Sequence, residues 1–387
     1  MYRTVYMDNN ATTPMADEVK AVMEDNLSLY GNASSMHALG RNAYSGIDWA
    51  RRMCADLIAC QEDEIYFTSG ASESNNTVFN IARDLIDGGS GRNRIVTTTI
   101  EHPSIIELVK YLRGKGYRID EAPVDASGMV KLDDMKALMG PDVLLVSVMT
   151  GNNETGTIQP VKEISAMAHE CGALMHSDAT QAIGKIPVSV ADLDLDYLSM
   201  SAHKFYGPKG VGALYARKGA PMLAFVHGGH QEKGYRAGTY NNLGIIGMGE
   251  AARLAARDLA KEHDHLWSLR ERLRRGIVDN IPDVVVNGCQ EHCLPGTLNV
   301  SFPCAEGESI LLYLDMEGIE VSTGSACATG SLEPSYVLLA GGLDVELAHG
   351  SIRFSLGRYN TEADVDYVIE KLAPIIARVR ALSTRKV

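Results

Sequence analysis

The chain has 387 residues, of which 45% are hydrophobic, and a formal net charge of -13 at pH 7. This length exceeds the size at which one hydrophobic core keeps growing, so two domains are expected. The negative charge argues against binding to nucleic acid or to an anionic membrane surface, since both would repel the protein. The N-terminus lacks a long apolar segment and no apolar run is long enough to span a bilayer, so we expect a cytoplasmic protein.

The seven cysteines are odd in number and irregularly spaced. This pattern fits reduced thiols better than a disulfide framework. Cys289 and Cys293 flank His292 in a run that has some features of a metal site, but no second half with suitable spacing follows. A loop beside a strand is the better interpretation, and we expect no metal site.

Short apolar segments alternate with helical patterns through most of the chain. Strands are expected at residues 65–68, 94–98, 143–148, 173–176, 197–200 and 212–215. Between them, apolar residues recur at helical spacing, as in the stripe of Val19, Val22, Met23 and Leu27, which Gly31 closes. Such stripes are core faces, and the alternation of strands and helices is typical of an α/β fold.

The pattern changes after about Glu262. A charged segment with 3.6-residue spacing predicts a helix over 265–281, and strands are expected at 298–302 and 352–356. The last helix should begin at Thr361, because Thr361 and Asp364 have the spacing of a capping box. We interpret this part of the chain as a second domain.

The most informative residue is Lys204, which an apolar strand delivers into a glycine-rich turn. A lysine amine is mostly protonated at pH 7, so its use as a nucleophile requires desolvation or a bound carbonyl cofactor. Pyridoxal 5'-phosphate (PLP) supplies such a carbonyl, and its pyridine nitrogen then needs an acidic partner. Asp178, which ends another short apolar strand, is well placed to be that partner. Taken alone, Lys204 is also compatible with a surface lysine beside a turn.

The small-residue turn 69–72 lies between an expected strand and the start of a helix. Backbone amides and the helix dipole favour a phosphate at such a position, and Ser72 adds a hydroxyl. An ordinary helix N-cap is the alternative. Ser201 and His203, which lie next to the lysine, would complete a phosphate cup.

Polar residues follow two further strands. His102 lies at a strand end, where open α/β sheets bind their ligands, and its ring is suited to stacking on a cofactor. A lone histidine is otherwise usually structural or exposed. Asn152, Asn153 and Glu154 form an equivalent polar cluster, for which turn-forming asparagines are the alternative.

Two residues of the second part complete the candidate site. Arg353 lies on a short expected strand, and its guanidinium matches an α-carboxylate, with an ordinary salt bridge as the alternative. Cys327 lies among small residues with no apolar period, so we expect it on an exposed, mobile loop. Cysteines are more commonly buried, but no apolar stripe is present to bury this one, and exposed thiols are candidates for chemistry.

Together these motifs resemble the PLP-dependent cysteine desulfurases of the nitrogen-fixation and iron–sulfur-cluster-assembly type, in the class-V aminotransferase-like family. The resemblance covers nearly the whole chain and rests on segments 8–14, 69–75, 101–102, 152–154, 176–181, 201–210, 236–239, 324–334 and 351–358, in family order. It implies the PLP-dependent transferase fold (fold type I). A large, mainly parallel-sheet domain would span 15–262, and a smaller α+β domain, made of 1–14 and 263–387, would carry the catalytic cysteine loop.

The resemblance also implies a role for each residue around the cofactor. Lys204 would hold PLP as an internal aldimine, while Asp178 would pair with the pyridine nitrogen and Gln181 with the phenolic oxygen. His102 would stack on the ring. The phosphate would be held by Ala71, Ser72, Ser201 and His203.

Further roles concern the substrate and the partners. Thr239 would reach the phosphate of a partner subunit, as in family homodimers. Asn153 and Arg353 would bind the carboxylate of L-cysteine, and Cys327 would take the sulfur as a persulfide, leaving alanine. The sulfur would pass to an iron–sulfur scaffold protein or another acceptor, and Cys327 could serve as a transient cluster ligand.

The chain departs from the family pattern in three places. Ser72 stands where threonine is commoner, and 340–343 is glycine-rich where bulkier residues are expected. The chain stops at Val387, short of the C-terminal extension that helps cluster-assembly members dock a scaffold. The first two departures remove no chemical group, and the third leaves the choice of partner open.

Two kinds of alternative function stay open. An aminotransferase or a selenocysteine lyase would share Lys204 and Asp178, but a transaminase needs no cysteine at position 327. A noncatalytic module that docks or ligates a cluster through Cys327 would not need Lys204, Asp178 or His102.

Overall fold

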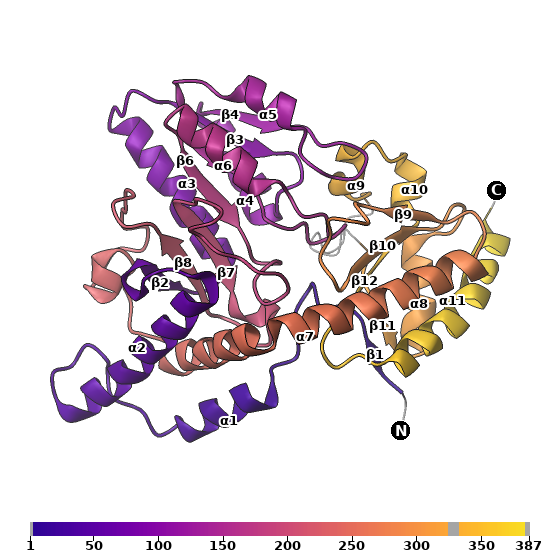
Figure 1. The fold of residues 1–387 in the computed structure, drawn as a ribbon, viewed down its shortest axis with the longest axis horizontal. Helices are drawn as coiled ribbons and strands as arrows, with labels where there is room; N and C mark the ends of the chain where they lie inside the picture. The colour runs from indigo at the N-terminus through magenta and orange to yellow at the C-terminus, as the bar shows by residue number, and fades with distance from the viewer. Residues whose placement is uncertain (1–2, 324–332, 384–387) are drawn as a thin grey trace.

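The computed structural model describes residues 3–323 and 333–383. Its largest element is a seven-stranded sheet with the strand order β2-β8-β7-β6-β5-β3-β4 (Figure 1). These strands span Ile65–Thr68 (β2), Arg94–Thr98 (β3), Arg118–Ala122 (β4), Val143–Ser147 (β5), Leu174–Asp178 (β6), Tyr197–Ser201 (β7) and Gly212–Ala216 (β8). All neighbours are parallel except β8, which runs antiparallel to both β2 and β7. The α/β prediction is therefore confirmed.

Helices cover both faces of this sheet, which explains why its central strands are buried along their whole length. Leu145 of β5 lies on one face of the sheet, where it packs in a core with Phe79 of α3 (Ala71–Asp87) and with residues of α4 (Pro103–Gly114). Its neighbour Val146 packs on the opposite face, against a core that includes Ile47 of α2 (Ala38–Ile58) and α6 (Val161–Glu170). Successive strand residues thus enter two different cores.

A smaller sheet lies to the right in Figure 1. Its strands β9 (Val285–Asn287), β10 (Thr297–Ser301) and β12 (Ser351–Ser355) are antiparallel in the order β12-β10-β9. Beside it, β1 (Val5–Tyr6) pairs with β11 (Ile319–Glu320), so the N-terminus joins this part of the molecule. The shorter helices are α1 (Asp17–Asp25), α5 (Leu132–Leu138), α8 (Gly307–Met316), α9 (Tyr336–Ala340) and α10 (Val345–His349).

One long helix, α7 (Asn242–Asn280), belongs to both parts of the molecule (Figure 1). Met248 lies in a core of the large sheet, whereas Leu273 lies in the core that the small sheet shares with α11 (Glu362–Leu382). The sequence predicted only the second half of this helix. The proposed domain boundary at residue 262 therefore falls inside α7. Among the described residues, no helix is long and apolar enough to cross a membrane.

The predicted stripe after Val19 is only partly correct. Helix α1 ends at Asp25, and the side chain of Leu27 is 66% exposed rather than part of a core face. Gly31 does not close the helix. A Cβ at this glycine would lie 2.3 Å from the backbone oxygen of Leu39, so the glycine permits a close approach to the start of α2.

The predicted capping box at Thr361 is present. The Thr361 hydroxyl accepts a hydrogen bond from the Asp364 backbone N–H (3.2 Å), and the Asp364 carboxylate accepts one from the Thr361 N–H (3.0 Å). These contacts satisfy N–H groups that the first turn of α11 leaves without helical partners.

We expect Thr361→Ala to lower the free energy of unfolding by about 1 kcal/mol, because the Asp364 N–H loses its side-chain acceptor and the Asp364 carboxylate loses the hydroxyl donor. Thr361→Ser, which keeps the hydroxyl, is the matched control and should stay close to wild type. Urea unfolding followed by circular dichroism measures both variants. Equal stability of the two would show that the cap contributes nothing.

Candidate active site

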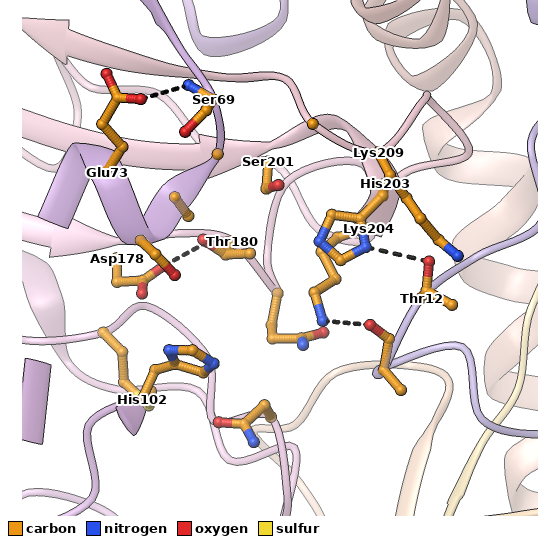
Figure 2. A pocket seen from close by; sticks show the side chains of 18 of the residues that line it. Thr12, Ser69, Glu73, His102, Asp178, Thr180, Ser201, His203, Lys204 and Lys209 are labelled. Atoms are coloured by element: carbon orange, nitrogen blue, oxygen red, sulfur yellow. Dashed lines mark hydrogen bonds between the residues drawn. The ribbon is translucent and has the colours of Figure 1, made fainter. Parts of the chain in front are cut away.

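A cavity of about 560 Å³ opens beside the carboxyl ends of the parallel strands, where open α/β sheets bind ligands (Figure 2). Nine of the predicted site residues line it: Ala71, Ser72, His102, Asn153, Asp178, Gln181, Ser201, His203 and Lys204. They come from α3, from the ends of β6 and β7, and from the segments that follow β3, β5, β6 and β7. The nine predicted residues that line the cavity are up to 133 positions apart in the sequence, from Ala71 to Lys204.

Lys204 reaches the cavity from a short 3-10 turn (Ala202–Lys204) directly after β7. Its Nζ donates to the backbone oxygens of Asn10 and Ala11, the second at 2.8 Å. The turn is tied to the same N-terminal segment, because the Thr13 N–H donates to the His203 carbonyl (2.9 Å). Contacts between the N-terminal segment and the turn, which lie about 190 residues apart in the sequence, thus hold Lys204 in place.

Asp178 ends β6, and its carboxylate is fixed from both sides. Oδ2 accepts a hydrogen bond from Asn75 Nδ2 (2.7 Å), and Oδ1 accepts one from the Thr180 backbone N–H (3.0 Å). Asn75 also donates to the Ser104 hydroxyl (2.9 Å). The Asp178 carboxylate is therefore held in one orientation at the edge of the cavity.

His102 is the N-cap residue of α4, and its ring points into the cavity (Figure 2). The Ser104 backbone N–H donates to His102 Nδ1 (3.1 Å). Nδ1 is therefore an acceptor, so a neutral ring carries its proton on Nε2. Burial, with the nearby Lys204 cation, lowers the pKa of His102, while Asp178 opposes this shift. The ring is consequently neutral and fixed at neutral pH.

The turn before α3 forms one end of the cavity. Ser69 and Ser72 line it, and the first N–H groups of α3 lie beside them. Ser201 and His203 face this turn from β7 and the segment after it. Burial and the charge of Lys204 lower the pKa of His203 to about 4, so its ring is neutral at pH 7. Hydroxyls and a helix N-terminus together suit an anion such as a phosphate.

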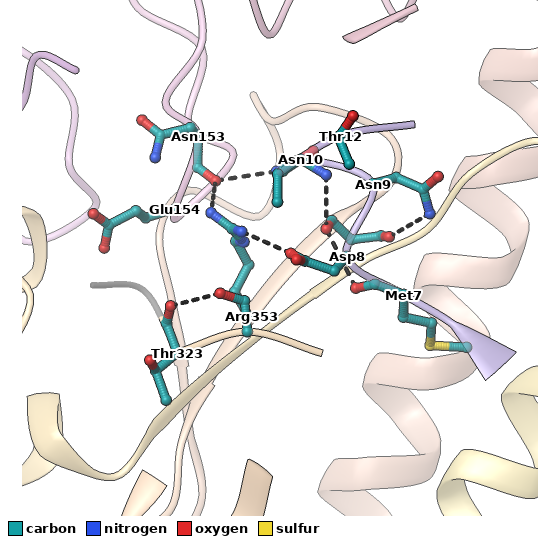
Figure 3. A network of polar contacts seen from close by, with 12 residues as sticks. Met7, Asp8, Asn9, Asn10, Thr12, Asn153, Glu154, Thr323 and Arg353 are labelled. Carbon is teal, nitrogen blue, oxygen red and sulfur yellow. Dashed lines mark hydrogen bonds and ion pairs between the residues drawn. The ribbon is translucent and has the colours of Figure 1, made fainter. Parts of the chain in front are cut away.

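Arg353 does not line the cavity. It lies on β12 with 2% exposure, where Nη2 pairs with Asp8 Oδ1 (2.8 Å) and Nη1 donates to the Asn153 backbone oxygen (3.1 Å; Figure 3). Its Nε and the Oδ1 atom of Asn153 are buried with no hydrogen-bond partner among the described residues. Arg353, behind the cavity, therefore keeps an unused donor, and Asn153, which lines the cavity, keeps an unused acceptor among the described residues.

Two predicted residues lie elsewhere. Thr239 is exposed, on a loop outside the cavity. That loop is fixed next to the turn before α3, because Arg236 forms a bidentate ion pair with Glu73 of α3 (2.8 and 3.1 Å). Cys327 lies outside the residues that the structure describes.

Sequence reasoning assigned no role to several residues that shape the site. Asn10 joins Lys204 to the small sheet, Asn75 fixes Asp178, and Lys185 contacts Gln181. Asn10 and Asn75 were noted only as members of longer motifs. Their contacts cross 103 to 194 positions of sequence, which no local periodicity reveals.

Glu101, which precedes His102, is also unexpected. It is fully buried, and Oε1 accepts hydrogen bonds from the Thr98 hydroxyl (2.6 Å) and the Met149 N–H (3.0 Å). Within the described residues, Oε2 has no partner. Burial, with a smaller contribution from the Asp178 charge, raises the pKa of Glu101 to about 8. Glu101 is therefore mostly protonated at neutral pH.

The chain belongs to the aminotransferase class-V family, whose model matches residues 5–368. Within this family it is similar to proteins named as cysteine desulfurases. It is 47% identical to the cysteine desulfurase IscS of Dictyoglomus turgidum, over 100% of this chain and 98% of that protein. It is 45% identical to a cysteine desulfurase of Gluconacetobacter diazotrophicus, over 98% of this chain and 95% of that protein.

Solved structures agree in fold. A NifS-like protein superposes with a TM-score of 0.91 and 40% identity, covering 97% of this chain and all of the other. The protein SspA, solved in complex with cysteine, gives a TM-score of 0.80 and 31% identity, covering 92% of this chain and all of SspA. The predicted membership of the NifS/IscS-type group, with its α/β fold of type I, is confirmed.

We expect the stability difference between Glu101→Gln and wild type to change with pH. Between about pH 5 and pH 8, the native state of wild type keeps a proton on Glu101, whereas the unfolded state, with the ordinary pKa of a carboxyl group, has already lost it. Native stability from this group therefore falls as pH rises, by up to about 1.4 kcal/mol per pH unit. Glutamine does not titrate, so the variant should gain stability relative to wild type as pH rises.

Urea unfolding of the cofactor-free protein at pH 5, 6.5 and 8 measures this trend. Glu24→Gln, at an exposed position on α1, is the control, and its difference from wild type should stay constant. A constant difference for Glu101→Gln as well would mean that the buried carboxyl does not retain its proton.

Proposed function

We propose that this protein is a cysteine desulfurase that uses PLP to convert L-cysteine into L-alanine and a persulfide on Cys327. The observation that carries the proposal is the convergence of Lys204, Asp178 and the turn before α3 on one cavity. An amine, a carboxylate and an anion-binding turn are the three protein groups that PLP requires. The similarity to proteins named as cysteine desulfurases supports the choice of reaction.

The residues present fit PLP. The turn before α3, with Ser72, Ser201 and His203, would hold the phosphate, and Asp178 would pair with the ring nitrogen. Asn75 and Thr180 already orient the Asp178 carboxylate, so it need not reorganise. His102 would stack on the ring and Gln181 would contact the phenolic oxygen. When bound at Lys204, PLP supplies an electron sink for the carbon atoms of the substrate.

The chain's own residues would handle substrate and protons. Asn153, through its amide N–H groups, and Arg353 would bind the substrate carboxylate, and the Arg353 Nε donor is buried without a partner among the described residues. Lys204 Nζ would remove the proton from the substrate Cα. His102, neutral with its proton on Nε2, would keep the ring side of the cavity uncharged, so that Lys204 and Asp178 dominate the local field.

The sulfur transfer would use Cys327. Its thiolate would attack the sulfur of the substrate, so that an S–S bond forms as the C–S bond breaks. The electron pair of the broken bond stays on carbon, which takes up a proton to become the methyl group of alanine. The carbon is reduced and the sulfur is oxidised, so no external oxidant is needed for this step.

We also propose a homodimer in which Thr239 reaches the cofactor phosphate of the partner subunit. Thr239 is exposed, and the ion pair of Arg236 with Glu73 holds its loop beside the turn before α3. Both observations support this role. The physiological acceptor would be an iron–sulfur scaffold protein or another sulfur acceptor. The two-domain division at residue 262, the cytoplasmic location and a transient cluster at Cys327 stay predictions.

Purified, PLP-loaded protein should form alanine from L-cysteine in the presence of a reducing thiol, in equal amount with sulfide. Lys204→Ala should lose both alanine formation and the visible absorbance band of the bound cofactor, because the attachment amine is gone. Lys218→Ala removes an exposed lysine and should retain both. Cofactor binding without alanine formation would favour an aminotransferase, which transfer of an amino group to a keto acid would then identify.

We expect Cys327→Ala to keep the cofactor absorbance and to lose sulfide release with L-cysteine by at least about a hundredfold, because no thiolate is left to take the sulfur. Cys304→Ala removes a different cysteine outside the cavity and should remain active. Mass spectrometry after one turnover should find an additional sulfur atom on wild type and on Cys304→Ala. Undiminished sulfide release by Cys327→Ala would exclude Cys327 as the acceptor.

A further inference from the structure

Lys185 is a buried cation directly behind the candidate active site. Its side chain is 8% exposed, and Nζ donates to Gln181 Oε1 (2.8 Å) and to Asn10 Oδ1 (3.0 Å). Both acceptors are neutral amide oxygens, and no salt bridge within residues 3–323 and 333–383 involves Lys185. Lysines are almost never fully buried without a charged partner, so this arrangement needs an explanation.

The ammonium group fixes the orientation of Gln181. A lysine ammonium can only donate, so it requires the oxygen end of the Gln181 amide. The nitrogen end then donates to the Asn10 backbone oxygen (2.9 Å), and Gln181 lines the cavity. A flipped amide would place its N–H groups against the ammonium and lose both contacts. The nitrogen of Gln181 is therefore locked away from Lys185, and Asn10 uses one of its two N–H groups, which leaves the other for a ligand in the cavity.

The same ammonium fixes Asn10. Because Oδ1 of Asn10 faces Lys185, Nδ2 is left to donate to the Asn153 backbone oxygen (3.1 Å) and to the Thr297 hydroxyl (2.9 Å). The Asn153 oxygen also accepts from Arg353 Nη1. One buried charge thus orients an amide on the cofactor side and an amide on the substrate side of the site.

The electrostatic surroundings explain what this charge requires. Burial lowers the pKa of Lys185 to about 7, and the cations Lys204 and Arg353 act in the same direction, while Glu262 of α7 opposes them. With this pKa, Lys185 is only partly protonated at neutral pH in the cofactor-free protein, and an anion delivered to the Gln181 side of the cavity would raise the pKa and keep the ammonium form. The phenolic oxygen of PLP would be such an anion when the cofactor is held at Lys204.

We propose that Lys185 is a positioning residue that locks the Gln181 amide as a donor to the phenolic oxygen of the cofactor, and that supports this oxygen in its anionic form. This role rests on the PLP-binding part of the proposed function. Lys185 itself does not line the cavity, so it acts through Gln181 rather than by touching the cofactor.

The test is a pH titration of the visible absorbance of the PLP-loaded protein. In Lys185→Met, which keeps the length of the side chain but removes its charge and donors, the midpoint should rise by about one pH unit, a tenfold tighter hold on the proton. Lys218→Met, at an exposed position, should titrate like wild type. An unshifted midpoint in Lys185→Met would overturn the proposal.

A double-mutant cycle separates positioning from a bare charge effect. If Lys185 acts through the amide, adding Lys185→Met to Gln181→Leu should shift the midpoint by less than half of its effect in wild type. A full shift in the Gln181→Leu background would overturn the positioning role. Lys185→Gln, which keeps a donor but no charge, should give an intermediate midpoint and serves as a second variant if Lys185→Met does not fold.

The same titration, with the alanine assay, distinguishes a failure of the proposed function from a failure of the role of Lys185. If wild-type protein gives no cofactor band, the proposed function fails and takes this inference with it. If wild type binds PLP and forms alanine while Lys185→Met titrates unchanged, only the role of Lys185 is overturned.

Discussion

The contacts of Asn10 are the constraint on which the rest of the site depends. Its backbone oxygen accepts hydrogen bonds from both Lys204 Nζ and Gln181 Nε2, and its side chain contacts Lys185, Asn153 and Thr297. The residue is 3% exposed, so water cannot replace these partners at low cost. The N-terminal segment therefore fastens the loops after β6 and β7 to the small sheet, and a change at Asn10 would be felt by every group around the cavity.

Burial sets the charges of the site. The pKa of Glu101, next to His102, rises to about 8, and the pKa of Glu154, next to Asn153, rises to about 7. Desolvation by burial is the largest cause of both shifts. The rings of His102 and His203 are kept neutral by the same cause. Carboxyl groups that would cancel the positive charge are thus partly neutralised, and the cavity keeps a field suited to ligands with a phosphate and a carboxylate.

The sequence predicted the strands of the large sheet because they are continuous apolar runs, and β2 and β3 begin and end where expected. It missed β4, whose residues Arg118–Ala122 include three charged side chains at the sheet edge. It missed the first half of α7, where residues 244 to 252 are buried all round and show no polar face. Strand ends identified the cavity residues, but Asn75, which orients Asp178, comes from a segment 103 positions away. Lys185 lies only four positions after Gln181, but nothing in the local pattern shows that its side chain is buried.

The chain is attached to the candidate site on both sides of the segment 324–332, which includes Cys327. Before it, Ser322 pairs through its backbone with Arg353, and after it, the Ser335 hydroxyl donates to Glu154, the neighbour of Asn153. Both attachments lie beside the residues proposed to hold the substrate carboxylate. The described parts of the chain on either side of residues 324–332 are therefore both anchored at the edge of the candidate site, one through the backbone of Arg353 and one through the side chain of Glu154.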